Sequence, residues 1–310
     1  MAHYITLDGG TSTTRISLCK DFKIMGTKKL AIGVRSAIDN KPLLEEKIKA
    51  GITELLAENS ITEEDVHRIF ASGMISSEFG LCPLEHATIP ISIYELKNTA
   101  REICIDKISS IPFVFVRGIK KLAKNPLECD VIRGEETEIA GIFDTRYGGS
   151  VYILPGSHSK VVRVNSQGII TDFSTLMTGE MIFALSESTI LKDAVDLSCD
   201  EISDEYLLLG YRYANEVGIN KALFKARILK NLHGISKNKV YSYFIGVVIC
   251  DEIREILKYD EDTVIIGGKS QLKVATGKIL QAVSNKRVVV LSDKEVDESV
   301  SRGLLKIFVS

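Results

Sequence analysis

Two short polar loops carry the residue types best suited to chemistry in this 310-residue chain. The first is Asp8-Gly9-Gly10-Thr11-Ser12, and the second is Pro155-Gly156-Ser157-His158-Ser159-Lys160. Glycines let the backbone approach a ligand closely and turn amide N–H groups toward it, while hydroxyls add further donors, which suits phosphate. Lys160 could reach a phosphate as a point charge. His158 could be a structural donor, a substrate contact or an exposed loop residue, and the structural role is favoured when it is taken alone.

Charged residues next to the first loop suggest how it could be used. Asp8 ends a strand, where it could hold Mg2+ through water. Arg15 lies on the returning strand and could meet an anionic substrate. By itself the first loop could equally be an ordinary hairpin turn.

An acidic pair follows Arg133-Gly134, at the expected start of a helix. Phosphoryl transfer to a hydroxyl needs a carboxylate within reach of that hydroxyl, and Glu135 or Glu136 could serve. Taken in isolation, the pair is better explained as first-turn acidic capping, which is common at helix starts. Arg133, like Arg15, could bind a substrate carboxylate through two hydrogen bonds.

Two later segments add candidate nucleotide contacts. Thr178-Gly179-Glu180 looks like a helix entry, with Thr178 as its cap. Gly267-Gly268-Lys269-Ser270 resembles the end of a P-loop, but that motif needs a glycine where Thr263 stands. A glycine turn after a strand fits contact with an adenosine group better.

Strand and helix patterns place these loops at the ends of secondary-structure elements. Alternating, β-rich runs predict strands over residues 3–7, 15–18, 24–30, 68–71 and 113–116, and again over 150–154, 160–164, 168–173, 263–266 and 287–291. Apolar periodicity predicts helices over about 43–56, 136–143, 180–192, 201–217, 221–232, 240–258, 270–283 and 295–308. Each half opens with a strand, a polar loop and a returning strand, so one α/β unit is used twice. We expect domains 1–146 and 147–310, each with a mixed sheet.

Composition narrows the functional class. Hydrophobic residues make up 45% of the chain and charged residues 26%, which is typical of a soluble globular protein, and the net charge is −2. Without a sustained basic stretch or a long apolar run, we expect no nucleic-acid or membrane partner. The N-terminal residues do not have the pattern of a secretory signal. Six scattered cysteines with no C-x-x-C pair predict a reducing, cytoplasmic setting.

Taken together, several segments resemble the 2-dehydro-3-deoxygalactonokinase family of actin-like sugar kinases. The segments that carry this resemblance are Ser72-Gly73-Met74-Ile75-Ser76-Ser77, Arg133-Gly134-Glu135-Glu136-Thr137-Glu138, Leu154-Pro155-Gly156-Ser157-His158-Ser159-Lys160, Asp172-Phe173 and Met177-Thr178-Gly179-Glu180. Their order and spacing are also similar to those of the family.

The resemblance implies two RNase H-like domains of the actin-like ATPase fold. Each would have a mixed five-stranded sheet flanked by helices, with an active-site cleft between the domains. Residues 1–146 would form the sugar-acid side and residues 147–310 the nucleotide side, with helix 295–308 able to pack back on the first domain.

The resemblance also implies an ATP- and Mg2+-dependent transfer that makes 2-dehydro-3-deoxy-6-phosphogalactonate in galactonate catabolism. Glu135 is the first choice for the catalytic base and Glu136 the second, while Asp8 would hold Mg2+ through water. The expected phosphate and ATP contacts are Gly9, Gly10, Thr11, Ser12, Gly156, Ser157, His158, Ser159, Lys160, Gly179, Gly267 and Gly268. The expected substrate contacts are Arg15, Ser77 and Arg133.

This chain departs from the family pattern in its first half. The family's first loop usually has Trp and Asn where this chain has Gly9 and Thr13, and the chain contains no Trp. Kinases for another sugar acid, other phosphotransferases of the same fold and a non-catalytic actin-like scaffold or sensor are therefore alternatives. The sequence does not determine whether the protein forms a homodimer.

Overall fold

The computed structural model describes residues 2–268 and 271–309, so Lys269 and Ser270 of the glycine turn lie outside the described residues. The chain divides into two compact units. Unit 1 contains Met1–Arg146, Gln167–Asp172 and Lys294–Ser310. Unit 2 contains Tyr147–Ser166 and Phe173–Asp293.

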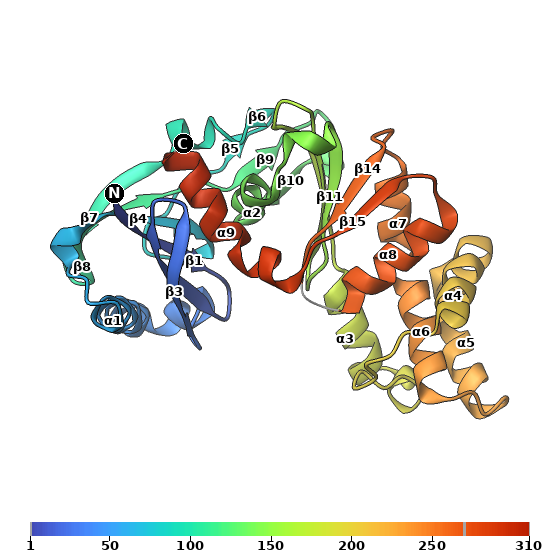
Figure 1. Ribbon diagram of the computed structural model, residues 1–310. Helices are drawn as coiled ribbons and strands as arrows, with labels where there is room; N and C mark the ends of the chain where they lie inside the picture. The colour runs from blue at the N-terminus through green and yellow to red at the C-terminus, as the bar shows by residue number, and fades with distance from the viewer. Residues whose placement is uncertain (1, 269–270, 310) are drawn as a thin grey trace. The chain divides into compact units, whose positions relative to one another are not determined.

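Unit 1 contains a large sheet of order β3-β2-β1-β4-β8-β7, a small sheet of order β10-β9-β5, and helices (Figure 1). Its strands are β1 (His3–Gly9), β2 (Thr14–Lys20), β3 (Lys23–Leu30), β4 (Val66–Gly73), β5 (Ala87–Thr88), β6 (Ile91–Ser92), β7 (Arg101–Ile105), β8 (Ser109–Phe115), β9 (Ile119–Lys121) and β10 (Asp130–Ile132). Its helices are α1 (Val34–Glu58), α2 (Glu135–Ile142) and α9 (Asp293–Phe308), all but the first residue of α9 lying in this unit.

Unit 2 combines a second sheet with a group of helices. Its strands are β11 (Ser150–Leu154), β12 (Ser159–Val164), the second half of β13 (Ile169–Leu176), β14 (Thr263–Ile266) and β15 (Arg287–Val290). Its helices are α3 (Thr178–Ser188), α4 (Asp204–Val217), α5 (Ile219–Asn231), α6 (Lys237–Val248), α7 (Cys250–Leu257) and α8 (Gln271–Val283). Figure 1 shows α4, α5 and α6 side by side.

The two sheets repeat one topology, as the sequence pattern predicted. Unit 1 has the order β3-β2-β1-β4-β8, and unit 2 has the order β13-β12-β11-β14-β15. In unit 1, β1 is antiparallel to β2 and parallel to β4. In the same way, β11 of unit 2 is antiparallel to β12 and parallel to β14. The expected count of five strands was wrong for both sheets, because β7 pairs antiparallel with β8 in the first sheet and β6 pairs antiparallel with β13 in the second, which makes six strands in each. The short strands between residues 87 and 132 were not predicted.

Strand register brings loops that are distant in the sequence to common sheet edges. Because β1 and β4 are parallel, Gly9 at the end of β1 pairs with Gly73 at the end of β4. In unit 2, Ile153 near the end of β11 pairs with Ile266 at the end of β14. The carboxyl ends of parallel strands meet at one edge, so each sheet presents a group of loops there.

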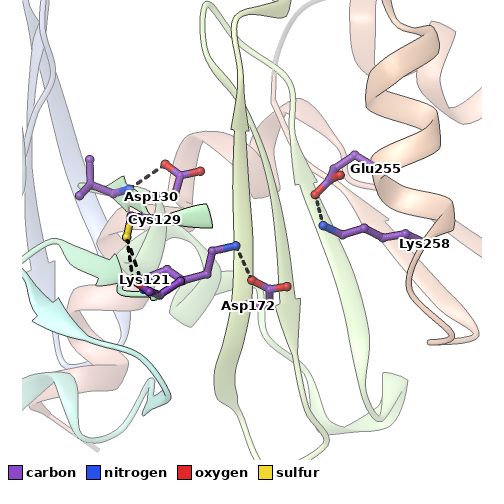
Figure 2. Close-up of polar contacts among 8 residues, drawn as sticks. Lys121, Cys129, Asp130, Asp172, Glu255 and Lys258 are labelled. Carbon is purple, nitrogen blue, oxygen red and sulfur yellow. Dashed lines mark hydrogen bonds and ion pairs between the residues drawn. The ribbon is translucent and has the colours of Figure 1, made fainter. Parts of the chain in front are cut away.

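Two returning segments join unit 1 from later in the chain. At the start of β13, Ile169 and Ile170 pair with Ser92 and Ile91 of β6. Nearby, Lys121 Nζ donates to Asp172 Oδ1 at 2.8 Å (Figure 2). An ion pair between β9 and β13 therefore accompanies the pairing of β13 with β6.

Helix α9 also returns to unit 1, where it contacts the sheet and α2. Ser301 accepts a hydrogen bond from Thr6 of β1 at 2.7 Å between buried hydroxyls. Lys306 donates to the carbonyl of Phe143, just after α2, at 2.8 Å. These contacts connect the end of the chain to β1 and to the helix that carries the acidic pair.

Each unit has its own apolar core. In unit 1, α1 contributes Leu44, Ile48, Ile52 and Leu55, spaced so that one helix face packs on the sheet. In unit 2 the predicted helix over 240–258 is instead two helices, α6 and α7, which meet at Ile249. In the part of the chain that the structure describes, no helix is long and apolar enough to span a membrane.

Candidate active site

The first glycine loop, between β1 and β2 of unit 1, is closed by its own backbone and by helix α1. Gly10 N–H donates to the carbonyl of Thr13 at 2.9 Å. The first amides of α1 bind the loop carbonyls, with Val34 N–H on Gly10 and Arg35 N–H on Thr11, each at 3.0 Å. The hydroxyl side chains of the loop are exposed. The loop is thus fixed through its carbonyls while its hydroxyls face outward.

Position 9 requires glycine in this structure because Ile75 packs against it. A Cβ atom at Gly9 would stand 2.5 Å from the Cβ of Ile75. Ile75 is fully buried in the 3-10 turn Met74–Ser76 that follows β4. Any residue larger than glycine at position 9 therefore needs residue 75 to shift.

Helix α2 is attached to the end of β4 by its first turn. The hydroxyls of Thr137 and Ser72 are 2.7 Å apart, and both are buried. Glu136 is also fully buried, and its Oε2 accepts from Gly134 N–H at 2.8 Å. Its Oε1 accepts from Thr137 Oγ1 at 3.1 Å. Burial, and then the neighbouring Glu135, raise the pKa of Glu136 to about 7.

Glu135, the first residue of α2, has a different environment from Glu136. It is half-buried rather than enclosed, and its Oε2 accepts a hydrogen bond from the backbone N–H of Arg133 at 2.9 Å. A general base must approach the hydroxyl that it deprotonates. Of the acidic pair, Glu135 is the residue with solvent access for that role.

Arg133 is hydrogen-bonded to the segment that follows β4. Its Nη1 donates to the carbonyl and hydroxyl of Ser76 at 2.7 and 2.9 Å. Its Nη2 donates to the carbonyl of Leu84 at 2.9 Å and lies 3.2 Å from a ring nitrogen of His86. Burial lowers the pKa of Arg133. The guanidinium thus joins α2 to residues 76–86.

Arg15 and Ser77 complete the candidates in unit 1. Arg15 pairs with Asp8 in the β1–β2 register, and its Nη2 lies 2.9 Å from Oδ1 of Asp297 on α9. The Oγ of Ser77 is buried and has no hydrogen-bond partner among the described residues. A buried polar atom in that state is unusual in proteins and often marks a ligand contact.

The second glycine loop, in unit 2, is supported in the same way as the first. Gly179 N–H, at the start of α3, donates to the carbonyls of Gly156 and Ser157 at 3.1 Å. Glu180 N–H donates to Ser157 at the same distance. A Cβ at Gly179 would stand 2.4 Å from the Gly156 carbonyl oxygen. In both units, therefore, helix amides hold the carbonyls of a glycine loop.

Side chains of the second loop also bind within unit 2. Lys160 is largely buried and donates to the carbonyl of His158 at 2.7 Å. The exposed His158 ring lies 3.1 Å from Glu180 Oε1. His158 thus contacts the first turn of α3 in this structure.

The glycine turn after β14 lies at the same sheet edge as the second loop. Gly267 N–H donates to the carbonyl of Ile153 at 2.8 Å, two residues before Pro155. The structure therefore groups Gly267 and Gly268 with the loop and with Gly179.

One residue of this site was missed from the sequence. Glu252 on α7 is fully buried, and Thr178 Oγ1 donates to its Oε2 at 2.9 Å. Thr276 of α8 donates to its Oε1 at 3.1 Å, and Ser159 of the second loop also binds it. A usable signal existed, because Glu252 falls on the apolar face of α7 set by Ile249, Ile253 and Ile256.

The donor set suits Mg2+ bound together with phosphate. No group of three or more His, Cys, Asp or Glu side chains forms a metal cage within residues 2–268 and 271–309. Mg2+ usually takes one or two carboxylates and completes its shell with water and substrate phosphates. Asp8, half-buried at the end of β1 beside the first loop, offers a carboxylate of this kind.

Comparison with known proteins gives consistent matches along the chain. The sequence model of the family described as 2-keto-3-deoxy-galactonokinase matches residues 8–307. A 2-dehydro-3-deoxygalactonokinase of Escherichia coli (strain K12) is 25% identical over 260 residues, which is 83% of this chain and 82% of the relative. A crystal structure from Sinorhizobium meliloti, assigned as a 2-dehydro-3-deoxygalactonokinase, has 25% identity and a TM-score of 0.78 over 97% of this chain and 96% of its own.

A more distant structure shows the fold alone. The activator of 2-hydroxyisocaproyl-CoA dehydratase from Clostridium difficile, solved with ADPNP bound, has a TM-score of 0.51 at 12% identity, and the match covers 98% of this chain and 93% of its own. The chain thus has an α/β, actin-like fold with mixed sheets flanked by helices.

Proposed function

We propose that this chain, which belongs to the 2-keto-3-deoxy-galactonokinase family, transfers the terminal phosphoryl group of ATP to the 6-hydroxyl of 2-dehydro-3-deoxy-D-galactonate. The family match over residues 8–307 carries the proposal. The reaction would supply the 6-phosphate in galactonate catabolism. Six free cysteines support a cytoplasmic setting for it.

Unit 2 would bind most of the nucleotide. The backbone amides of residues 156–160 and the exposed Ser157 would receive the phosphates, with Lys160 adding positive charge. Gly179 would allow the close approach of α3, and the turn at Gly267 and Gly268 would face the adenosine. The support for these roles is that all these segments meet at one edge of the sheet.

Unit 1 would supply Mg2+ binding and the base. Gly9, Gly10 and the hydroxyls of Thr11 and Ser12 would contact the phosphates, and Asp8 would hold Mg2+ through water. When bound, Mg2+ neutralises charge on the phosphate oxygens.

We assign the base to Glu135 rather than Glu136, because Glu136 is enclosed and already binds Gly134 and Thr137. Glu135 would take the proton of the 6-hydroxyl as that oxygen bonds to phosphorus and ADP leaves.

The substrate carboxylate needs a cation, and Arg15 fits this role better than Arg133. The Arg133 guanidinium is engaged with Ser76, Leu84 and His86, so it would order the sugar-acid side. The Arg15 guanidinium is bound to the exposed Asp297 of α9, in a surface ion pair that a substrate carboxylate could replace. The buried Oγ of Ser77 would bind a substrate hydroxyl.

A kinase for a related sugar acid is the second candidate, and the Gly9–Ile75 contact favours it. This chain has Gly9 where the family usually has Trp, and Ile75 packs against that glycine. The first-loop side of the site therefore has a different shape. A 2-dehydro-3-deoxy acid of another stereochemistry would then be the preferred substrate.

The decisive experiment is a coupled ADP-release assay with MgCl2 and a panel of sugar acids. We expect turnover on 2-dehydro-3-deoxy-D-galactonate, and Glu135→Gln should lower kcat by about 100-fold or more while leaving the fold intact. Glu136→Gln is the matched control, because it makes the same substitution at the neighbouring carboxyl. Lack of turnover on every sugar acid would reject the kinase proposal, whereas loss of activity only in Glu136→Gln would transfer the base to Glu136.

A further inference from the structure

Glu252 joins three elements of unit 2 through one buried carboxylate. Its side chain has no solvent exposure, and three hydroxyls bind it. Thr178 belongs to the first turn of α3, Thr276 to α8 and Ser159 to the second glycine loop. Neither the sequence motifs nor the proposed chemistry gives Glu252 a task.

The hydroxyls of Ser159 and Thr178 belong to the second glycine loop itself and to the helix that supports it. Ser159 Oγ binds Glu252 and lies 3.4 Å from Gly156 N, across the loop. Thr178 precedes Gly179, whose amide holds the carbonyls of Gly156 and Ser157. The carboxylate therefore contacts the loop directly and also through the helix that supports it.

Stability alone does not account for a buried glutamate here. Burial raises the pKa of Glu252, so its ionised form is costly, and apolar residues can replace buried charged groups with little loss of stability. The hydrogen bonds from Ser159, Thr178 and Thr276 act against that rise in pKa by stabilising the ionised carboxylate, which accepts hydrogen bonds only and so orients every hydroxyl that it binds. What Glu252 adds is therefore a fixed direction for Ser159 and Thr178.

We infer that Glu252 is a positioning residue that sets the second loop in the conformation that receives the nucleotide's phosphates. It follows that Ser159, fully buried and engaged with Glu252, supports the loop from beneath, while Ser157 and the loop amides meet the phosphate. This inference rests on the proposed function, since it names the nucleotide as the ligand of that loop.

The test uses the full chain and separates the two substrates. Glu252→Gln keeps the size of the side chain but replaces one acceptor oxygen by an amide NH2 group. That group cannot accept the hydrogen bond that the facing hydroxyl donates in the wild type. We expect KM for ATP to rise about tenfold, because small misplacements at a reacting site cost large factors, with KM for the sugar acid unchanged within about twofold. Ser159→Ala should act in the same direction. The double variant should be no worse than either single variant, because coupled residues are not additive.

Ser242→Ala provides the matched structural control. Ser242 is a buried hydroxyl of α6 that donates to Asn238 and accepts from Ser203, away from the loop. Its loss should lower Tm without changing KM for ATP. If Glu252→Gln behaves like this control, or raises both KM values equally, the inference is wrong. Should Glu252→Gln fail to fold, Thr178→Val must raise KM for ATP on its own, and an unchanged value would overturn the idea.

A binding measurement keeps this inference separate from the kinase proposal. Isothermal titration with ADP and MgCl2 needs no sugar acid. Weaker ADP binding in Glu252→Gln, together with no turnover by the wild type, would support the role of Glu252 and reject the kinase. Equal ADP affinity in both proteins, or none in the wild type, would overturn the role of Glu252.

Discussion

The buried Glu136 should make the stability of this protein depend on pH in a predictable direction. The folded protein raises the pKa of this carboxyl from 4.5 to about 7. Between these values the unfolded chain has lost the proton while the folded protein retains it. Stability therefore falls as pH rises from about 4.5 to 7 and is level above that range. Glu136→Gln is neutral throughout and lacks this dependence.

The size of the effect follows from the displacement of the pKa. At about 1.4 kcal/mol per pH unit, the full displacement is worth roughly 3 kcal/mol, of which about 2 to 3 kcal/mol falls between pH 5 and pH 8. The glutamine amide can still accept from Gly134 and donate to a neighbouring hydroxyl, so its packing is retained. The stability of Glu136→Gln relative to wild type should therefore increase by that amount over this range.

Urea unfolding followed by circular dichroism at several pH values measures this difference. Glu46→Gln, at an exposed carboxyl of α1, removes the same formal charge and should show no comparable change. A difference between Glu136→Gln and wild type that stays constant from pH 5 to pH 8 would refute the reasoning, since it would mean that Glu136 is ionised in the folded protein throughout.

Two further predictions concern close contacts at the glycine loops. Gly9→Ala should destabilise the protein by about 1 to 3 kcal/mol because its Cβ would stand 2.5 Å from the Cβ of Ile75, and it should cost less in an Ile75→Gly background, which lacks that atom. Chemical denaturation of the single and double variants would show equal costs in both backgrounds if the contact were unimportant. Gly179→Ala should raise KM for ATP by about tenfold or more, because its Cβ would displace the Gly156 carbonyl, and ADP-release kinetics with an unchanged KM would contradict this expectation.

Local sequence signals predicted the strands, loops and helices that have a clear residue pattern of their own. The strand, loop and returning strand of each half are visible in alternating residues and glycine turns, and so is the repeat of one α/β unit. The same local patterns placed Asp8, Glu135 and the second loop at element ends. The family match agrees with the resemblance read from the segments around residues 133–138 and 154–160.

Features that depend on contacts between distant residues could not be predicted from local sequence patterns. The break between α6 and α7 at Ile249 and the sixth strand of unit 1 depend on packing and pairing with other elements. The difference between Glu135 and Glu136, adjacent in sequence, arises only because α2 turns one into the interior and leaves the other at the surface.

Glu252 is the clearest example of a feature that local sequence patterns did not predict. Its three hydroxyl partners come from residues 159, 178 and 276, far apart in the chain, and no motif connects them. Sequence alone predicted which residues could bind phosphate, because glycine and hydroxyl chemistry is local. Only the folded structure determined which carboxylates are buried and which hydroxyls they hold, because burial and hydrogen bonding depend on the surroundings.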